Sequence, residues 1–222
     1  MRTSFVNGLT VLALSSLAAI ACSNADARGA KPDKAAQDSL TTKADLGRID
    51  GSPDAKVWVV EVSDLQCPYC KAWHDKTFPV VRDEYVKTGK IRLAYVNFPL
   101  SQHRNAQAAA HAAMCASAQG KFWQMHDALF STQAQWETTA APIPFFETLA
   151  NKAGVAVPAW KSCVTSRALQ PLIDADLDRA RNAGVQSTPS FIIGGKLIEG
   201  ALPPAEMRKA IDDALGAIKP SK

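Results

Sequence analysis

The chain has 222 residues, of which 47% are hydrophobic and 21% charged. This balance is typical of one folded domain, with or without an insertion, and excludes a largely disordered or fibrous chain. The net charge of +4 comes without a block of Lys or Arg, so we expect no nucleic acid among the partners.

Residues 1–27 are typical of an export signal. Arg2 precedes an apolar stretch over residues 9–21, which is too short to span a bilayer comfortably but suits a secretory signal. Ala25-Asp26-Ala27 offers a cleavage site. Ala19-Ile20-Ala21 before Cys22 resembles a bacterial lipoprotein signal in which Ala replaces the usual Leu. We therefore expect an exported protein of the periplasm or cell envelope, either soluble or lipid-anchored through Cys22.

The five Cys of the chain are an odd number, and the signal accounts for one of them. Whether Cys22 is lipidated or removed, four Cys remain for a domain in an oxidising compartment, where disulfides persist. Residues 28–44 are rich in Lys, Asp, Ala and Gln and predict a linker or poorly ordered arm.

Residues 45–101 predict a βαβ unit. Residues 57–62 form an apolar β-rich run that indicates a central strand buried on both faces. A helix is predicted to begin at Pro68, where a missing N–H costs nothing, to kink at Pro79 and to end at Gly89. Residues 91–96 predict the second strand, which the helical crossover makes parallel to the first.

Residues 102–183 predict an all-helical insertion of four or five helices, because apolar residues recur there at helical spacing between Gly and Pro breaks. Residues 184–222 return to β structure. Gly194-Gly195 separates two short β-rich runs, which indicates a hairpin with a two-residue turn. A closing helix is predicted over 204–217. The fold class is therefore α/β, in the order βαβ, helical block, ββα.

Cys67-Pro68-Tyr69-Cys70 is the strongest chemical signal in the sequence. At a helix N-terminus, the helix dipole and free N–H groups stabilise a thiolate at Cys67 and lower its pKa. A lower pKa makes that sulfur a better leaving group and a Cys67–Cys70 disulfide more oxidising. The alternatives are half of a zinc site or an inert disulfide, but no second Cys pair or His pair stands at zinc-ligand spacing.

Glu61 lies six residues before Cys67, inside an otherwise apolar strand. A buried carboxyl shifts its pKa and can take and return the proton of Cys70 during exchange. The alternative is a carboxylate at a strand edge that meets solvent. His74 lies one helical turn beyond Cys70, where a surface histidine is the favoured interpretation and an influence on the site is the alternative.

Thr188-Pro189 directly precedes the first strand of the predicted hairpin. A cis bond before Pro189 would leave the backbone of Thr188 free to pair with an extended substrate. Because only about 5% of such bonds are cis, the spacing alone favours a trans turn.

Together, Glu61, the Cys67–Cys70 motif after a strand, Thr188-Pro189 before the hairpin and the inserted helices resemble the DsbA-like thiol–disulfide oxidoreductases of the thioredoxin superfamily, over roughly residues 46–218. The resemblance implies a thioredoxin fold with a helical insertion. It implies that Cys67 is the nucleophile, Cys70 its resolving partner and Pro189 a cis residue facing the disulfide. Pro68, Tyr69, Thr188 and Pro189 are then the substrate-binding residues.

Cys115 and Cys163 stand in different predicted helices of the insertion. In an exported domain, a second, structural disulfide between them is the economical interpretation, and two buried free thiols are the alternative.

We expect a monomeric oxidase that acts on reduced or unfolded secreted proteins and is reoxidised by a quinone-linked membrane partner. It needs no cofactor and no metal, since the cysteines are the redox centre. The Pro68-Tyr69 dipeptide and Thr188 also occur in reductase and isomerase branches, so a reductase or isomerase with the same site is the first alternative. A non-catalytic metal-binding or chaperone module is the second.

Overall fold

A five-stranded mixed sheet forms the centre of the computed structural model, which describes residues 34–218. The strand order is β1-β3-β2-β4-β5, and only β2 and β3 are parallel neighbours. The strands are β1 Ile49–Gly51, β2 Val57–Ser63, β3 Ile91–Asn97, β4 Ser190–Ile193 and β5 Lys196–Glu199. The predicted parallel pair and C-terminal hairpin are both confirmed. Gly194 and Gly195 take positive φ in the turn between β4 and β5, as a two-residue hairpin turn requires.

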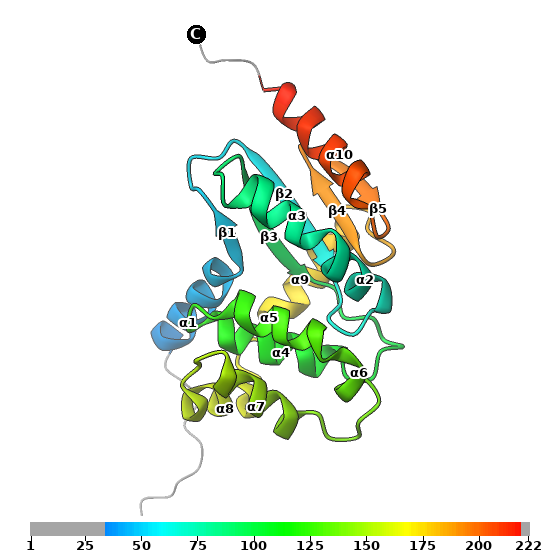
Figure 1. Cartoon of the computed structure of the whole chain (residues 1–222). Helices are drawn as coiled ribbons and strands as arrows, with labels where there is room; N and C mark the ends of the chain where they lie inside the picture. Colours follow the sequence, from blue (N-terminus) through cyan, green and yellow to red (C-terminus); the bar gives the residue numbers. More distant parts are fainter. Residues whose placement is uncertain (1–33, 219–222) are drawn as a thin grey trace, which may run out of the picture. The chain divides into compact units, whose positions relative to one another are not determined.

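The predicted helical insertion is confirmed between β3 and β4, and Figure 1 shows α4, α5, α7 and α8 packed together there. Helix α10 lies instead beside β4. The thioredoxin fold with an inserted helical subdomain is therefore the architecture observed. The helices after β2 are α2 Pro68–Lys76, α3 Phe78–Val81, the π-helical η1 Arg82–Val86, α4 Ala106–Ser117, α5 Phe122–Ser131, α6 Gln133–Trp136, α7 Ile143–Lys152, α8 Val157–Ser166, α9 Gln170–Asn182 and α10 Pro204–Gly216.

The two faces of the sheet carry different cores, because successive side chains of a strand point to opposite faces. Val59, Leu93 and Phe191 lie on one face, in the main core that α2, α5 and α10 also enter. Val62 lies on the other face, where it packs against Ala180 of α9. Glu61 has the parity of Val59 and therefore projects into the main core, on the side where α2 begins.

The poorly ordered arm predicted over residues 28–44 is wrong for the described part of that range, because residues Lys34–Gly47 form helix α1. Ala44 is fully buried, Leu40 packs against the core, and Gln37 donates a hydrogen bond to the Ala168 carbonyl at 2.7 Å. The residues of α1 that face inward thus recur at helical spacing, but they include polar as well as apolar side chains. The hydrophobic pattern was therefore too weak to predict the helix.

Strand β1 was also not predicted, because it has only three residues and pairs antiparallel with the outer edge of β3. A buried ion pair fixes this region to α9. Arg48 donates to both carboxylate oxygens of Asp176, and the Asn97 side chain donates to the same carboxylate at 2.8 Å. Partners this far apart in sequence could not be inferred from a local pattern.

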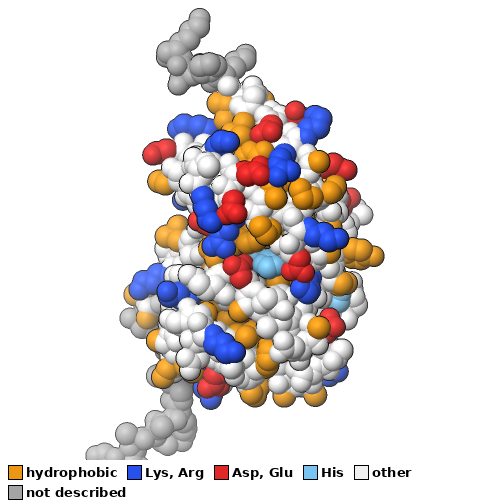
Figure 2. Space-filling view, in the orientation of Figure 1, with side chains coloured by type: hydrophobic (Ala, Val, Ile, Leu, Met, Phe, Trp, Pro, Cys, Tyr) orange, Lys and Arg blue, Asp and Glu red, His pale blue; other side chains and the backbone are white. Residues whose placement is uncertain are grey.

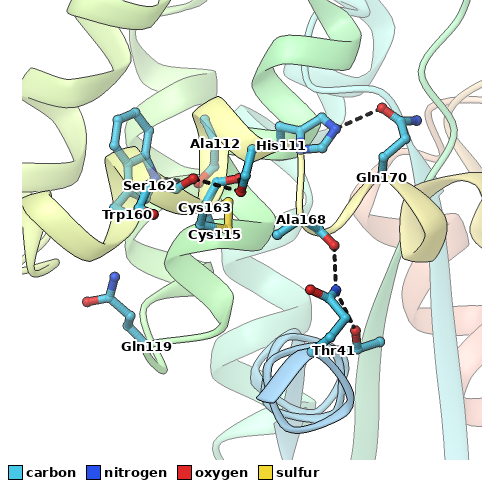
Figure 3. Close-up of a disulfide and its surroundings, with 12 residues drawn as sticks. Thr41, His111, Ala112, Cys115, Gln119, Trp160, Ser162, Cys163, Ala168 and Gln170 are labelled. Carbon is cyan, nitrogen blue, oxygen red and sulfur yellow. Dashed lines mark hydrogen bonds between the residues drawn. A yellow bond between two sulfur atoms is a disulfide. The ribbon is translucent and has the colours of Figure 1, made fainter. Parts of the chain in front are cut away.

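Cys115 of α4 and Cys163 of α8 form a disulfide within the insertion, with an S–S distance of 2.02 Å (Figure 3). Beside it, the indole N–H of Trp160 donates to the Ala112 carbonyl at 2.9 Å and joins the same two helices. The bond closes a long loop, since the two residues are 48 positions apart. It therefore ties together helices that the chain connects only through α5, α6 and α7.

Basic and acidic side chains are interspersed on the face that Figure 2 shows, without a patch of one sign. Within residues 34–218, no helix is long and apolar enough to cross a membrane. The predicted export signal and Cys22 lie outside the described residues.

Candidate active site

Cys67 caps the N-terminus of α2, and Pro68 occupies the first helical position. The strand before it ends at Ser63, and the Cys67 amide donates to the Asp64 carbonyl at 3.0 Å, which closes the turn between strand and helix. Cys67 and Cys70 are both free thiols in this structure. Cys67 is 3% exposed and Cys70 is completely buried. An incoming thiolate therefore has access only through Cys67.

The surroundings of the two sulfurs push their pKa values apart. The hydrogen bond from the Cys70 thiol is the largest influence on Cys67, and together with the Thr188 side chain and the backbone N–H groups of Tyr69 and Cys70 it outweighs burial. It lowers the pKa of Cys67 to about 6. Burial, followed by the neighbouring Cys67 sulfur, raises the pKa of Cys70 well above its usual range. At neutral pH, Cys67 is thus a thiolate beside a protonated Cys70.

The fold brings Thr188 to Cys67 across 121 positions of the chain. The Cys67 thiol lies 3.5 Å from the Thr188 carbonyl oxygen. The Thr188–Pro189 peptide bond is cis, and β4 begins at the next residue, beside the end of β2. Tyr69, between the two cysteines, is 69% exposed. The Thr188 backbone therefore borders the sulfur, and Tyr69 presents an exposed ring two residues further along the chain.

Glu61 is completely buried, between Tyr95 of β3 and Phe191 of β4 in the sheet register. Neither carboxylate oxygen has a hydrogen-bond partner among the described residues. Burial raises the pKa of Glu61 to about 7. Cys70 and Tyr95 belong to the same buried core cluster, and Glu61 lies beside Tyr95 in the sheet, so the carboxyl and the thiol lie in the same part of the core. The alternative of a solvent-facing edge carboxylate does not hold.

Glu61→Gln is expected to stabilise the protein more at pH 8 than at pH 4. Below its ordinary pKa of 4.5, Glu61 is protonated in both the folded and the unfolded protein, so its ionisation does not change the free energy of unfolding. As pH rises towards 7, the unfolded chain ionises first, which costs the folded state roughly 3 kcal/mol. Gln mimics the neutral acid and avoids that loss. Denaturant unfolding at the two pH values measures the difference, with Glu206→Gln on the exposed surface of α10 as control. An effect of Glu61→Gln that is equal at both pH values would contradict the burial argument.

Asp64 was not singled out from the sequence, yet it holds the turn before Cys67 in place. Its carboxylate is buried and accepts the backbone N–H of Gln66 at 2.8 Å, the backbone N–H of Leu100 at 2.9 Å and Nδ1 of His103 at 2.6 Å. Gln133 adds a side-chain hydrogen bond to the Leu65 carbonyl at 2.8 Å. The only sequence signal was an acidic residue between an apolar strand and the Cys motif, because its partners lie on distant segments.

A second cluster of polar side chains lies behind α2. His74 and His126 both contact Oδ1 of Asp127, at 3.3 Å and 2.9 Å, and Arg82 donates to Oδ2 at 3.0 Å. One potential metal-ligand atom from each of His74, His126 and Asp127 lies within 4.8 Å of the other two. The Arg82 guanidinium already balances the charge of Asp127. We therefore interpret this cluster as an ion-pair network and not as a metal site.

Comparison with known proteins links this geometry to a family. The thioredoxin family matches residues 43–213. The probable disulfide bond formation protein D of Bacillus cereus is 32% identical over 170 residues, which cover 74% of this chain and 77% of that protein. The disulfide bond formation protein D of Bacillus subtilis is 25% identical over 167 residues, which cover 74% and 75% of the two chains.

Solved structures show the same fold. Oxidised BdbD from Bacillus subtilis superposes with a TM-score of 0.71 at 24% identity, over 78% of this chain and 95% of that chain. Alpha-DsbA1 from Wolbachia pipientis gives a TM-score of 0.68 at 22% identity, over 76% of this chain and 90% of that chain. These structures establish the architecture, and the thioredoxin family match together with the Bacillus cereus relative establishes the family.

Proposed function

Since this chain belongs to the DsbA-like thiol–disulfide oxidoreductases of the thioredoxin superfamily, we propose that it is a dithiol oxidase that introduces disulfides into other proteins through Cys67 and Cys70. The observation that carries this proposal is the difference between the two sulfurs. One has a pKa of about 6, and the other is buried and protonated. A stabilised Cys67 thiolate favours the reduced enzyme, so its disulfide readily oxidises other thiols.

Oxidation proceeds by two exchanges. A substrate thiolate attacks Cys67 in the Cys67–Cys70 disulfide, and the electron pair of the broken bond leaves on Cys70. A second substrate thiolate then attacks the substrate sulfur of the mixed disulfide, and Cys67 leaves as a thiolate. The substrate has lost two electrons and the enzyme has gained them, so a bound redox cofactor is not required.

Glu61 supplies the proton that Cys70 needs when it leaves. A carboxyl with a pKa of about 7 is divided between its acid and its base near neutral pH, which is the condition for efficient general acid–base catalysis. Its burial near Cys70 prevents the proton from being lost directly to bulk water. Glu61 then recovers it when the enzyme is reoxidised.

The substrate chain is expected to lie over Pro68, Tyr69, Thr188 and Pro189. Tyr69 offers an exposed ring, and Thr188 offers backbone groups next to the Cys67 sulfur. A surface of one ring and a backbone edge discriminates little among side chains. This suits an enzyme for varied reduced or unfolded proteins exported with it to the periplasm or cell envelope. Reoxidation by a quinone-linked membrane protein completes the proposed cycle.

The direction of electron flow is the first point to test. The equilibrium of Cys67–Cys70 with glutathione gives the reduction potential, and the oxidase requires a value clearly above that of thioredoxin, about −270 mV. A potential near −270 mV would instead establish the reductase alternative. The names of the relatives, which refer to disulfide formation, favour the oxidase.

Trapping tests the exchange itself. In Cys70→Ala, the lone Cys67 thiolate is expected to attack substrate disulfides and to remain joined to them, because its resolving partner is gone. Adducts that reductant releases should form with this variant and not with the Cys67→Ala/Cys70→Ala double variant. No adduct through Cys67 would remove the mechanism and restore the non-catalytic module as the better interpretation.

A further inference from the structure

A surface pocket of about 400 Å³ lies between the loop that follows β3 and helix α9. Phe98, Leu100 and Leu177 contribute apolar side chains to its lining, and Arg104 and Arg181 contribute two positive charges. None of the described residues that line the pocket is acidic. We call it the Arg104–Arg181 pocket. It combines apolar surface with uncompensated positive charge, and the proposed cycle gives it no role.

Arg104 and Arg181 differ from the other arginines of residues 34–218 because their side chains have no partner. Neither guanidinium forms an ion pair, a hydrogen bond or a ring contact with any described residue. The others are each held by a carboxylate, an amide or a ring, namely Arg48, Arg82, Arg179 and Arg208 by carboxylates, Arg167 by Gln170 and Arg92 by Trp58. Both charges of this pocket are therefore free to bind an anionic group of another molecule.

Gln107 adds a hydrogen-bond donor to the same pocket. Its Nε2 atom is buried and has no acceptor among the described residues. A buried donor without an acceptor destabilises the folded protein, and a ligand oxygen would remove that cost once the amide turns towards the pocket. Guanidinium and amide N–H groups are donors that bind carboxylates well, and the apolar lining suits the methylene groups of a Glu or Asp side chain. The chemistry of the pocket thus points to a carboxylate.

The pocket lies at the end of the sheet where the active site lies. The parallel strands β2 and β3 end together, because their last residues pair. Two residues that line the pocket contact the Asp64 carboxylate, Leu100 through its N–H at 2.9 Å and His103 through Nδ1 at 2.6 Å. Asp64 precedes Cys67 so closely in the chain that their Cα atoms are at most about 11 Å apart. An extended substrate of about five residues can therefore reach from Cys67 to the pocket.

The opposite wall of the pocket leads to the other side of the reactive sulfur. Arg181 stands in the last turn of α9, and the chain continues from there to Thr188, whose carbonyl oxygen lies 3.5 Å from the Cys67 sulfur. Between them, Val185 belongs with Phe98 to the smaller core on the second face of the sheet. Both walls of the pocket are thus continuous with the segments that flank Cys67.

We propose that the Arg104–Arg181 pocket binds an acidic side chain of the substrate polypeptide, a few residues from the cysteine that reacts with Cys67. The inference rests on the proposed function and adds a sequence preference to it. The Tyr69 ring and the Thr188 backbone accept a chain of any sequence, whereas the pocket favours chains with Asp or Glu at a suitable distance. No bond forms or breaks in the pocket, so its role is to orient the substrate for exchange.

The test compares two dithiol peptides that differ only by Glu or Gln at one position, with both termini capped so that Glu supplies the only carboxylate. Single-turnover oxidation by the oxidised full-length protein gives the rate for each peptide. Because a nearby carboxylate also changes the peptide thiol, each rate is divided by that of the same peptide with uncharged hydroxyethyl disulfide. With Glu about five residues from the nearest cysteine, a preference of roughly fivefold is expected, since each exposed ion pair contributes modestly. Salt at about 1 M should weaken this preference.

Double variants show whether the pocket itself is responsible. Arg104→Gln/Arg181→Gln removes both charges and should bring the two normalised rates together. Arg167→Gln/Arg208→Gln removes two charges outside the pocket and is the matched control, which should keep the wild-type preference. Arg104→Glu/Arg181→Glu reverses the charge and should favour a Lys peptide over the Gln peptide. Damage to the fold would not produce such a switch.

Each remaining outcome has a definite meaning. Equal normalised rates in the wild-type protein wherever Glu is placed, or a preference that Arg104→Gln/Arg181→Gln retains, would overturn the inference while leaving the oxidase intact. A preference lost to the same extent in Arg167→Gln/Arg208→Gln would show attraction by net charge and would also overturn it. Failure of the wild-type protein to oxidise either peptide would overturn the proposed function itself.

Discussion

Cys67→Ser is expected to reduce the oxidation of dithiol substrates at least about a thousandfold, since removal of an enzymatic nucleophile leaves only the uncatalysed route. A serine hydroxyl is not ionised near neutral pH and cannot form the Cys67–Cys70 disulfide. The loss should therefore appear at every pH and substrate concentration. The rate of peptide oxidation by pre-oxidised protein, followed by mass, measures it.

Cys70→Ser is the matched control for that variant. It also lacks the redox disulfide and cannot turn over, but it keeps the Cys67 thiolate. We expect it to form one mixed disulfide per molecule with an oxidised peptide, whereas Cys67→Ser forms none. Equal adduct formation by both variants would show that Cys70, and not Cys67, is the reactive sulfur.

Loss of the Cys115–Cys163 disulfide is expected to lower the free energy of unfolding by about 4 kcal/mol. This is the loop-closure contribution of a cross-link between residues 48 positions apart. Cys115 and Cys163 are both buried, so substitution by Ala would add cavity effects to the loss of the bond. Reduction of the bond in a protein of unchanged composition gives a cleaner comparison.

The comparison is made in a Cys67→Ser/Cys70→Ser background, where Cys115–Cys163 is the only disulfide that reductant can open among the described residues. Urea unfolding with and without reductant then reports on that bond alone. A change below about 1 kcal/mol would mean that helices α4 and α8 hold each other through packing, including the Trp160 contact, and that the bond adds little.

The sequence predicted those parts of the fold whose signal is local. The strand over residues 57–62, the helix beginning at Pro68 and the hairpin around Gly194-Gly195 each carry their pattern in a short window. Helix α1 and strand β1 do not. The buried face of α1 alternates Gln37 and Thr41 with Leu40 and Ala44, and β1 depends on the edge of β3 for its partner.

The candidate site divides in the same way. The Cys67–Cys70 pair and Glu61 can be found from the sequence, because they stand next to one strand–helix turn. The position of Thr188 beside Cys67 was expected only through the family resemblance. Asp64 with His103, and Asp127 with His74, were beyond local reasoning, because each pair is formed by the packing of segments far apart in the chain.

The pH dependence of Cys67 alkylation in the reduced protein tests the central claim most directly. The thiolate reacts and the thiol does not, so the rate reports ionisation of this sulfur, and peptide mapping distinguishes Cys67 from Cys70. The structure requires a midpoint of about 6 for Cys67, with Cys70 unmodified. A midpoint near 8.5, the value of an ordinary cysteine, would show that the site does not stabilise the thiolate and would contradict the proposed oxidase.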